Sequence, residues 1–323
     1  MDKFINKLNL DFIANQKILK LIGNIDGFKG KWNITEVQEN NYLKELRKIA
    51  TIESIGSSTR IEGATMTDKE VQELLNDIKI TKLKSRDEQE VIGYYEVLEL
   101  IYENYNNIHL TESYIKQLHQ LLLKYSSKDE RHRGGYKHLS NKVVATYPTG
   151  EQRTIFTTTE PALVEGEIQE LIEWTNQQLQ KQEIHPLIIV GSFIYDFLSI
   201  HPFQDGNGRL SRLLTTLCLL QNDYTFIQYI SFENHIEQNK KDYYEALMSG
   251  QKNRGADSER IDKWLIFFLS SLNVLAQKLE QKYDVFKSKG GYLNERQKQI
   301  KHFIETNQPV KVSDIDKHFS NIQ

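Results

Sequence analysis

The run PLIIVGSFIYDFLSI, residues 186–200, constrains what this chain can fold into more than any other stretch. Pro186 suits the first turn of a helix, where its missing N–H would have no partner in any case. The residues after it are apolar on nearly every side of such a helix, which therefore needs other helices around it. The run is too short to cross a bilayer, and it contains Asp196. We predict a buried central helix over residues 187–200 in a soluble protein.

Apolar residues recur with helical spacing in five further segments, and only five prolines interrupt the chain. Gly56 would end the first of these helices. Thr67 with Glu70 fits a capping box at the start of the second. Thr111 and Pro161 fit the starts of the fourth and fifth. The pattern predicts an all-α fold. The side chains expected to face inward are Leu43, Leu46, Ile49 and Ile52, then Val71, Leu74 and Leu75, then Val91, Tyr95, Leu98 and Tyr102, then Ile115, Leu118 and Leu122, and finally Val164, Ile168 and Leu171.

One segment departs from the helical pattern. Residues 134–161, GGYKHLSNKVVATYPTGEQRTIFTTTEP, are rich in β-branched residues and are divided by Tyr147-Pro-Thr-Gly150. This composition predicts a β-hairpin. A lone hairpin is marginally stable in water, so it would have to dock on the helices or wait for a partner strand. A hairpin without a function is the alternative that the pattern leaves open.

The last part of the chain, residues 290–323, differs in character from the rest. It predicts one helix, then a short strand at residues 309–312, then a second helix from Ser313. This order resembles the opening of a winged helix-turn-helix. The chain as given ends at Gln323, where a recognition helix would follow, so we expect no DNA reading by it. The apolar face of the first helix would consist of Ile300, Phe303 and Ile304.

Charge and cysteine content exclude several classes of function. The formal net charge of −3 gives no basic footprint for nucleic-acid binding. The single cysteine, Cys218, lies in the apolar run LLTTLCLL and cannot form an internal disulfide or a cysteine zinc site. The first residues, MDKFINKLNL, lack the apolar core of a signal peptide, so we expect a cytoplasmic protein. The histidines without metal-ligand spacing, which we interpret as structural or solvated, are His119, His138, His185 and His235.

The run that follows the central helix, HPFQDGNGRLSR at residues 201–212, forms a candidate phosphate site. A new helix should begin near Gly208, and a helix N-terminus offers unpaired N–H groups and a partial positive charge. Gly206 and Gly208 let the backbone close around a ligand. Asn207 can donate a side-chain N–H to a phosphate oxygen. Arg209 and Arg212 would lie on one helix face, where both can bind further phosphates.

Two other side chains of this run add chemistry. Asp205 would repel a bound phosphate unless a cation lies between them, which implies Mg²⁺. His201 is the side chain here that is suited to accept a proton near neutral pH. Together they predict a polyphosphate site with Mg²⁺ and a general base. A polar loop that only caps a helix is the plainer alternative.

The run matches every fixed position of the signature HxFx(D/E)GNGRxxR, and the chain resembles the Fic family from roughly residue 90 to 275. The resemblance implies an all-helical Fic fold with a hairpin flap. It implies the transfer of AMP from ATP to a Ser, Thr or Tyr hydroxyl of a protein (AMPylation). The implied roles are proton acceptor from that hydroxyl for His201, Mg²⁺ ligand for Asp205, contacts to the α- and β-phosphates for Gly206, Asn207 and Gly208, contacts to the outer phosphates for Arg209 and Arg212, and packing of the loop for Phe203.

The resemblance also assigns residues outside the signature. Tyr243 and Tyr244 match positions next to the nucleoside, although two aromatic core residues of a helix would look the same. Gln251 stands where some relatives carry asparagine in contact with adenine. In Fic proteins a flap lies over the site and pairs with an extended segment of the target protein. The strand that offers its edge would consist of Lys142, Val143, Val144 and Ala145.

A second motif precedes the signature. Residues 58–63, STRIEG, fit the (S/T)xxxE(G/N) pattern by which Fic proteins inhibit themselves, with Ser58, Glu62 and Gly63 at its fixed positions. Because the motif lies before the Fic core, the resemblance implies an N-terminal inhibitory helix. Glu62 would pair with Arg212 and occupy the arginine meant for the γ-phosphate. A surface glutamate beside a glycine turn is the alternative.

These observations predict an N-terminal helical region at residues 1–90 with the inhibitory motif, a Fic domain at 91–275 and a partial winged helix at 290–323. The expected partners are ATP and a protein hydroxyl, which could belong to the chain itself. A homodimer stays open, and no membrane is expected. Two competing hypotheses remain. One is a hydrolase that removes AMP with a water positioned by Glu62, and the other is a DNA-binding regulator that senses nucleotide.

Overall fold

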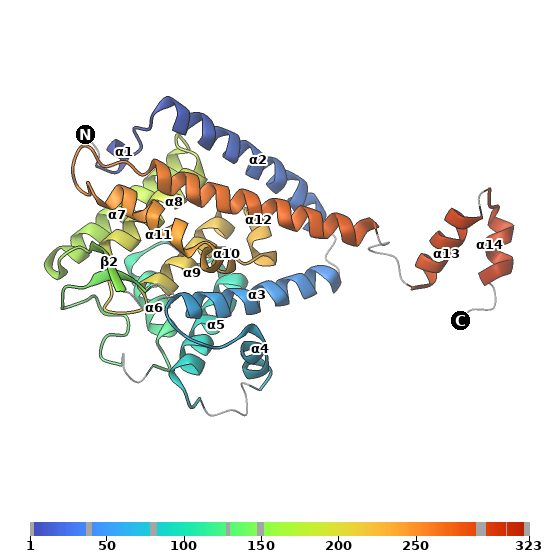
Figure 1. The fold of residues 1–323 in the computed structure, drawn as a ribbon, viewed down its shortest axis with the longest axis horizontal. Coiled ribbons are helices and arrows are strands. Elements are labelled where there is room, and N and C mark those ends of the chain that lie inside the picture. Colours follow the sequence, from blue (N-terminus) through green and yellow to red (C-terminus); the bar gives the residue numbers. More distant parts are fainter. Residues whose placement is uncertain are drawn as a thin grey trace. The chain divides into compact units, whose positions relative to one another are not determined.

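The computed structural model describes residues 3–36, 41–77, 83–126, 130–146, 152–288, 295–307 and 309–319. The chain divides into two units, Met1–Ala276 and Gln277–Gln323. Helices dominate both units (Figure 1). Within these described ranges no helix is long and apolar enough to cross a membrane. The boundary that we predicted at residue 90 falls inside the first unit and stays a prediction.

The first unit is built from helices and one hairpin, which confirms the predicted all-α class with its β-hairpin. Its two strands are β1 (Lys142–Thr146) and β2 (Gln152–Thr157). α12 (Asp262–Ser288) starts in this unit and continues in the second. The other helices, in chain order, are α1 (Lys3–Asn6), α2 (Phe12–Glu36), α3 (Asn41–Ile61), α4 (Asp68–Asn76), α5 (Arg86–Asn104), α6 (Glu112–Leu122), α7 (Pro161–Lys181), α8 (Pro186–Ile200), α9 (Asn207–Gln221), the 3₁₀ helix η1 (Thr225–Tyr229), α10 (Phe232–Gln238) and α11 (Lys240–Gln251).

The predicted central helix is α8. Every residue from Ile189 to Ile200 is buried, because α8 packs against both α7 and α9 and the start of α12 covers its remaining side. Trp264 of α12 donates its indole N–H to the carbonyl of Gly191 at 2.7 Å. A Cβ at Gly191 would lie 2.8 Å from the side chain of Leu265, so a larger residue there would require that side chain to shift. α8 therefore places its last residue, and the loop that follows, inside the protein.

The predicted helix starts are confirmed, but one predicted helix end is wrong. Thr67 forms a capping box with Glu70, and Thr111 accepts a hydrogen bond from a backbone N–H in the first turn of α6. The expected stop at Gly56 does not occur, because α3 continues to Ile61. A Cβ at Gly56 would lie 2.5 Å from the Asp68 carboxylate, so the glycine makes room for an ion pair instead of ending the helix.

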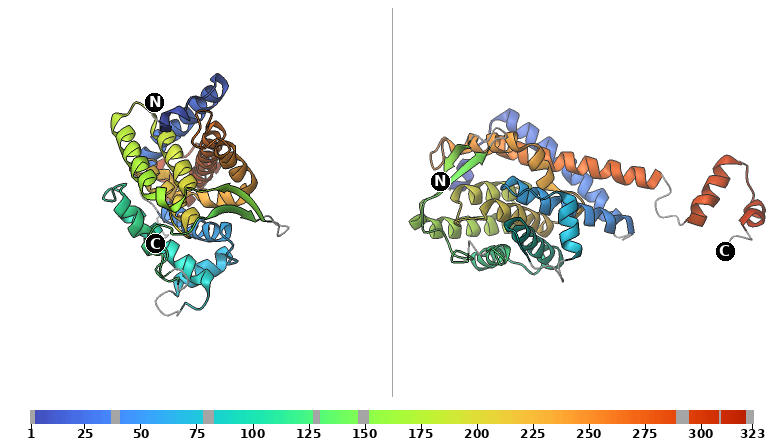
Figure 2. Two further views of the ribbon diagram at one scale, coloured as in Figure 1. Left: turned by 90° about the vertical axis from the view of Figure 1, so that its left-hand side faces the viewer. Right: turned by 60° about the horizontal axis from the view of Figure 1, so that its bottom comes forward.

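The hairpin forms as predicted and docks on helix α11. β1 and β2 pair antiparallel with an irregularity between Val143 and Val144. Phe156 of β2 is buried. Figure 2 shows the strands extending away from the helices, and the predicted turn at residues 147–150 lies outside the described residues. Of the two alternatives, docking on the helices or waiting for a partner strand, the structure thus shows docking.

The second unit contains the end of α12 and two helices, α13 (Glu295–Thr306) and α14 (Val312–Phe319). The strand predicted at residues 309–312 is wrong. A strand needs a partner to bind its backbone groups, and the described part of this unit offers none. The segment leads into α14 instead, since the Asp314 carboxylate accepts a hydrogen bond from the Lys311 N–H at 3.0 Å. Phe303 stacks on His318 with 4.5 Å between ring centroids, which joins the two helices.

Candidate active site

The loop between α8 and α9 is held by its own backbone geometry and by two buried side chains. His201 ends α8 in the left-handed region, with φ of 53°, and Gly206 precedes α9 with φ of 79°. Phe203 is fully buried. Asn207 accepts from the Phe203 N–H at 2.9 Å and donates to the Phe203 carbonyl at 2.8 Å. The loop is therefore preorganised around Phe203, as its implied role required.

The structure shows a use of the Asn207 side chain beyond the predicted phosphate contact, which stays a prediction. We expected its side-chain amide to donate to a phosphate oxygen. The amide is instead buried and engaged at both ends by the backbone of Phe203. The backbone N–H groups at the start of α9 offer a bound phosphate further partners.

His119 on α6 supports the same loop, and sequence reasoning missed this role. Its ring stacks on Phe203 with centroids 3.7 Å apart. Its Nδ1 accepts from the Gly134 N–H at 3.0 Å, which places the ring proton on Nε2, 3.0 Å from the carbonyl oxygen of Asp205. His119 is fully buried among the apolar residues of α6. A histidine on the apolar face of a predicted helix was the signal that could have found it.

His201 has the geometry of a proton acceptor. Its Nδ1 lies 3.2 Å from the carbonyl oxygen of Leu198, so Nδ1 carries the proton and Nε2 keeps a lone pair. Burial lowers the pKa of His201 to about 4. The imidazole is therefore uncharged at neutral pH and available as a base.

A cavity of about 230 Å³ borders this loop. It collects predicted residues from the motif at 58–63, the hairpin, the signature and α11. Phe156 and Leu247 add apolar walls. Of the predicted residues, Ser58, Gly63 and Arg209 are absent from the lining, and the side chains of residues 143–145 lie outside the described part of the structure. The predicted residues that line the cavity are Glu62, Lys142, His201, Asp205, Gly206, Asn207, Gly208, Arg212, Tyr243 and Tyr244.

The Glu62 carboxylate lies where the signature predicts an anion site. Nη2 of Arg212 donates to the Glu62 carboxylate at 2.8 Å and to the Ser58 carbonyl at 2.9 Å, and Nε of Arg212 donates to the Ser58 hydroxyl at 2.8 Å. A Cβ at Gly208 would lie 2.2 Å from the Glu62 oxygen, so the carboxylate rests against the first turn of α9. Burial alone would raise the pKa of Glu62, but Arg212 and Arg209 hold it below its usual range. Glu62 is thus an anion bound at the positive end of α9.

Arg209 lies behind the loop rather than in the cavity. Its side chain is 1% exposed, and its two terminal nitrogens lie 3.3 Å from carboxylate oxygens of Glu90 and Asp205. A guanidinium in this position balances the charges of the Glu90 and Asp205 carboxylates. Its contact with outer phosphates stays a prediction, because in this arrangement the guanidinium does not line the cavity.

Asp205 is the residue that could bind a metal ion. Its carboxylate lines the cavity, and its Oδ1 accepts from the Gly206 N–H at 2.6 Å. Among the described residues no group of three or more histidine, cysteine, aspartate or glutamate side chains could hold a metal. Mg²⁺ commonly binds proteins through one or two carboxylates and completes its shell with substrate phosphates and water. A single carboxylate beside an anion site therefore fits Mg²⁺ brought in with a nucleotide.

The two tyrosines of α11 border the cavity in different ways. Tyr243 is buried, with its ring centroid 5.7 Å from that of Trp264, and burial raises its pKa to about 12. Tyr244 is half-buried, 5.2 Å from Tyr243 between ring centroids. Tyr243 is thus a core residue with an edge on the cavity. Gln251 is buried against Ser199 and does not line the cavity.

Lys137 connects the hairpin to the loop and was also missed. Its ammonium donates to Asn141 at 2.9 Å, to Thr158 at 2.7 Å and to the carbonyl of Ile200 at 3.1 Å. Its backbone N–H donates to the carbonyl of Pro202 at 2.9 Å. Lys137 is 2% exposed and therefore ties both ends of the hairpin to the residues on either side of the candidate base.

Replacing Lys137 with methionine should lower the rate of the reaction that uses His201 as base by about ten- to a hundredfold, because small displacements of a base from its target slow proton transfer strongly. Burial, with the nearby Arg254, lowers the pKa of Lys137 to about 8. Below pH 8 the three protons of the Lys137 ammonium match its three acceptors. Above pH 8 the amine has lost one proton, and one acceptor loses its hydrogen bond. Activity of the parent should fall above pH 8, and Lys137→Met should lack this limb. Lys124→Met, at a surface ion pair, is the control. Identical pH profiles for parent and Lys137→Met would rule out this role.

Comparisons with known proteins agree with this geometry. The family model described as the Fic/DOC family matches residues 109–219. The protein adenylyltransferase Fic of Drosophila mojavensis is 28% identical over 189 residues, which are 58% of this chain and 35% of that protein. Its counterpart in Drosophila melanogaster is 28% identical over the same length, 36% of that protein. The chain thus spans about a third of the length of these relatives.

Solved structures show the same fold. A Fic family protein from Desulfovibrio desulfuricans G20 superposes with a TM-score of 0.69 at 21% identity, over 94% of this chain and 84% of that one. Fic-1 (residues 134–508) from C. elegans superposes with a TM-score of 0.64 at 18% identity, over 84% of this chain and 73% of that one. The helical arrangement around the loop is therefore a known one.

Proposed function

The chain contains a Fic/DOC family domain at residues 109–219, and from this premise we propose that it is a protein adenylyltransferase. In the proposed reaction AMP passes from ATP to a Ser, Thr or Tyr hydroxyl of a protein, which could be the chain itself. The observation that carries the proposal is the shared cavity, which is lined both by His201 and by the start of α9 with Arg212. A nucleophile and a phosphate chain can meet there.

The residues divide the chemistry between them. His201 takes the proton of the target hydroxyl at Nε2, and the hydroxyl oxygen attacks the α-phosphorus. The bond from that oxygen to phosphorus forms as the bond to pyrophosphate breaks. The backbone N–H groups at the start of α9 and the Arg212 guanidinium stabilise the charge that gathers on the phosphate oxygens. Mg²⁺, when bound, would be held by Asp205 and would neutralise the phosphates.

We propose that Glu62 inhibits this reaction. Its carboxylate takes the two groups that an ATP phosphate needs, the start of α9 and Arg212. ATP that binds beside Glu62 would have its phosphates displaced and its α-phosphorus out of line with the hydroxyl. Ser58 supports this arrangement because it holds Arg212 through both its hydroxyl and its carbonyl.

The hairpin offers a docking edge for the target. In the described part of the structure β1 pairs only with β2, so its other edge is available to an extended segment. Lys142 of β1 lines the cavity, which brings such a segment to the site. Pairing through the backbone would bind targets without requiring one sequence.

The position of the label in ATP tests the proposed reaction. The Glu62→Gly variant should label protein from ATP carrying ³²P at the α-phosphorus and not from ATP carrying it at the γ-phosphorus. The reason is that transfer of AMP leaves only the α-phosphorus on the protein, while the β- and γ-phosphorus leave as pyrophosphate. Label from the γ-position would indicate a kinase, and no label from either would contradict the proposal.

Removal of AMP is the second candidate. It is favoured by the presence of Glu62 in the same cavity as His201, where its carboxylate could orient a water towards an AMP–protein bond. A protein modified with AMP beforehand would release it on incubation with the parent chain. Glu62→Gly would then abolish this release, whereas for a pure transferase the parent would release none.

A further inference from the structure

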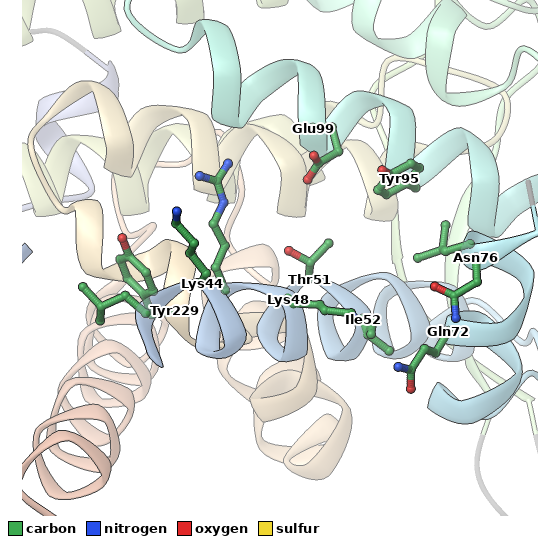
Figure 3. A pocket seen from close by; sticks show the side chains of 12 residues that line it. Lys44, Lys48, Thr51, Ile52, Gln72, Asn76, Tyr95, Glu99 and Tyr229 are labelled. Atoms are coloured by element: carbon green, nitrogen blue, oxygen red, sulfur yellow. The ribbon is translucent and has the colours of Figure 1, made fainter. Parts of the chain in front are cut away.

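A second cavity of about 360 Å³ lies between α3, α4 and α5, outside the proposed active site. None of its lining residues takes part in the chemistry described above. Figure 3 shows Lys44 and Thr51 of α3 across from Tyr95 and Glu99 of α5, with α4 at one end and Tyr229 at the other. A volume of this size accepts a small molecule.

The cavity combines apolar walls with an excess of positive charge. Leu43, Ile52 and Leu75 contribute aliphatic surface. Three cations, Lys44, Arg47 and Lys48, come from one face of α3, where residues three and four apart are neighbours. The lining contains one carboxylate, Glu99. A ligand that complements this lining carries an acidic group and a flat or aliphatic body.

The helix that forms one wall also carries the inhibitory residues. α3 runs without a break from Asn41 to Ile61, so its cationic face and Ser58 belong to one rigid element, about 15–20 Å apart at 1.5 Å per residue. The opposite wall, α5, continues to Glu90, which lies 3.3 Å from Arg209. Both walls therefore lead directly to the groups around the start of α9.

We propose that this cavity binds a small amphipathic anion and that binding strengthens inhibition by Glu62. The second part rests on the proposed function. A ligand that touches α3, α4 and α5 together fits only while α3 lies against α5 as it does here, and a ligand favours the state that binds it. At about ten times its Kd, such a ligand shifts the equilibrium towards that state by about tenfold.

The binding arm of the test uses 8-anilinonaphthalene-1-sulfonate, an aromatic anion that fluoresces on binding. Its Kd for the full chain should rise at least about tenfold in R47E/K48E, because two attractive charges become repulsive. K17E/K20E, at exposed lysines of α2, makes the same change in net charge outside the cavity and should leave the Kd unchanged. R47Q/K48Q, a milder pair, should weaken binding even if the charge reversal unfolds the chain, which circular dichroism would reveal. Equal affinities for R47Q/K48Q and K17E/K20E would overturn the proposal.

Displacement of this probe distinguishes two sources of the ligand. AMP would displace it if the cavity prefers a flat ring with a phosphate, and dodecanoate would displace it if the cavity prefers an aliphatic chain with a carboxylate. Either result supports an amphipathic anion. Displacement by neither, at millimolar concentration, would contradict the ligand class.

The coupling arm measures AMP transfer with the cavity saturated by the probe. Transfer by the parent should fall about tenfold at ten times the Kd, while Glu62→Gly should be unaffected because it has no inhibitory carboxylate to stabilise. Equal loss in both proteins would refute the coupling. If Glu62→Gly transferred no AMP at all, the proposed function would fail, yet the binding arm would still decide whether the cavity is a ligand site.

Discussion

Replacing Glu62 with glycine is expected to raise AMP transfer on the order of a hundredfold. The variant removes the carboxylate that lies 2.8 Å from Arg212 and rests against Gly208. The freed guanidinium and helix terminus can then bind the phosphates of ATP in line with the hydroxyl. Incorporation of labelled AMP into the chain itself and into proteins of a cell lysate measures the effect.

Glu62→Gln is the matched variant for this experiment. It keeps the size of the side chain but loses its charge, so its pairing with Arg212 is weaker and its activity should lie between those of the parent and Glu62→Gly. Substituting Glu70, an exposed capping residue of α4, provides a control for loss of a carboxylate elsewhere. Equal activity of Glu62→Gly and its parent would remove inhibition by Glu62 from this account.

Replacing His201 with alanine in the Glu62→Gly background should lower AMP transfer by about 10²–10⁴-fold, the range typical of a lost general base. ATP affinity, measured by calorimetry, should change little, since the anion site lies on α9 and Arg212. Retained transfer would show that His201 is not the base.

The pH dependence provides a second check on His201. Its folded pKa of about 4 is below the ordinary value, so the ring is unprotonated at every pH above that range. AMP transfer by Glu62→Gly should therefore show no histidine limb between pH 6 and 8. If AMP transfer by Glu62→Gly instead rose with a midpoint near pH 6.5, the pKa of His201 would be close to its ordinary value, and burial would not perturb it in this way.

The helices were largely predictable from the sequence because their causes are local. Apolar residues on all sides predict a helix such as α8, and the capping residues Thr67 and Glu70 predict the start of α4. Gly56 shows the limit of this reasoning. This glycine leaves room for the ion pair between Arg60 and Asp68. In the sequence, a glycine with this role cannot be distinguished from one that ends a helix.

The strand predicted near Pro309 failed for a related reason. A strand is stable only when its backbone groups find a partner, and no local pattern reveals whether one is present. The docking of the hairpin was equally undecided from the sequence. Phe156 and its burial beside the cavity resolved it.

The candidate site shows the same division. The signature at residues 201–212 predicted by itself an anion site, a base and a metal ligand, which stay proposals, since a turn with two glycines before a helix brings such groups together from neighbouring residues. The tertiary structure alone decided that Asn207 serves the loop, that Arg209 lies beneath it, and that His119 and Lys137 hold it in place. The role of a buried polar side chain depends on its hydrogen-bond partners, and each of the last two binds the loop through a backbone carbonyl more than sixty residues away.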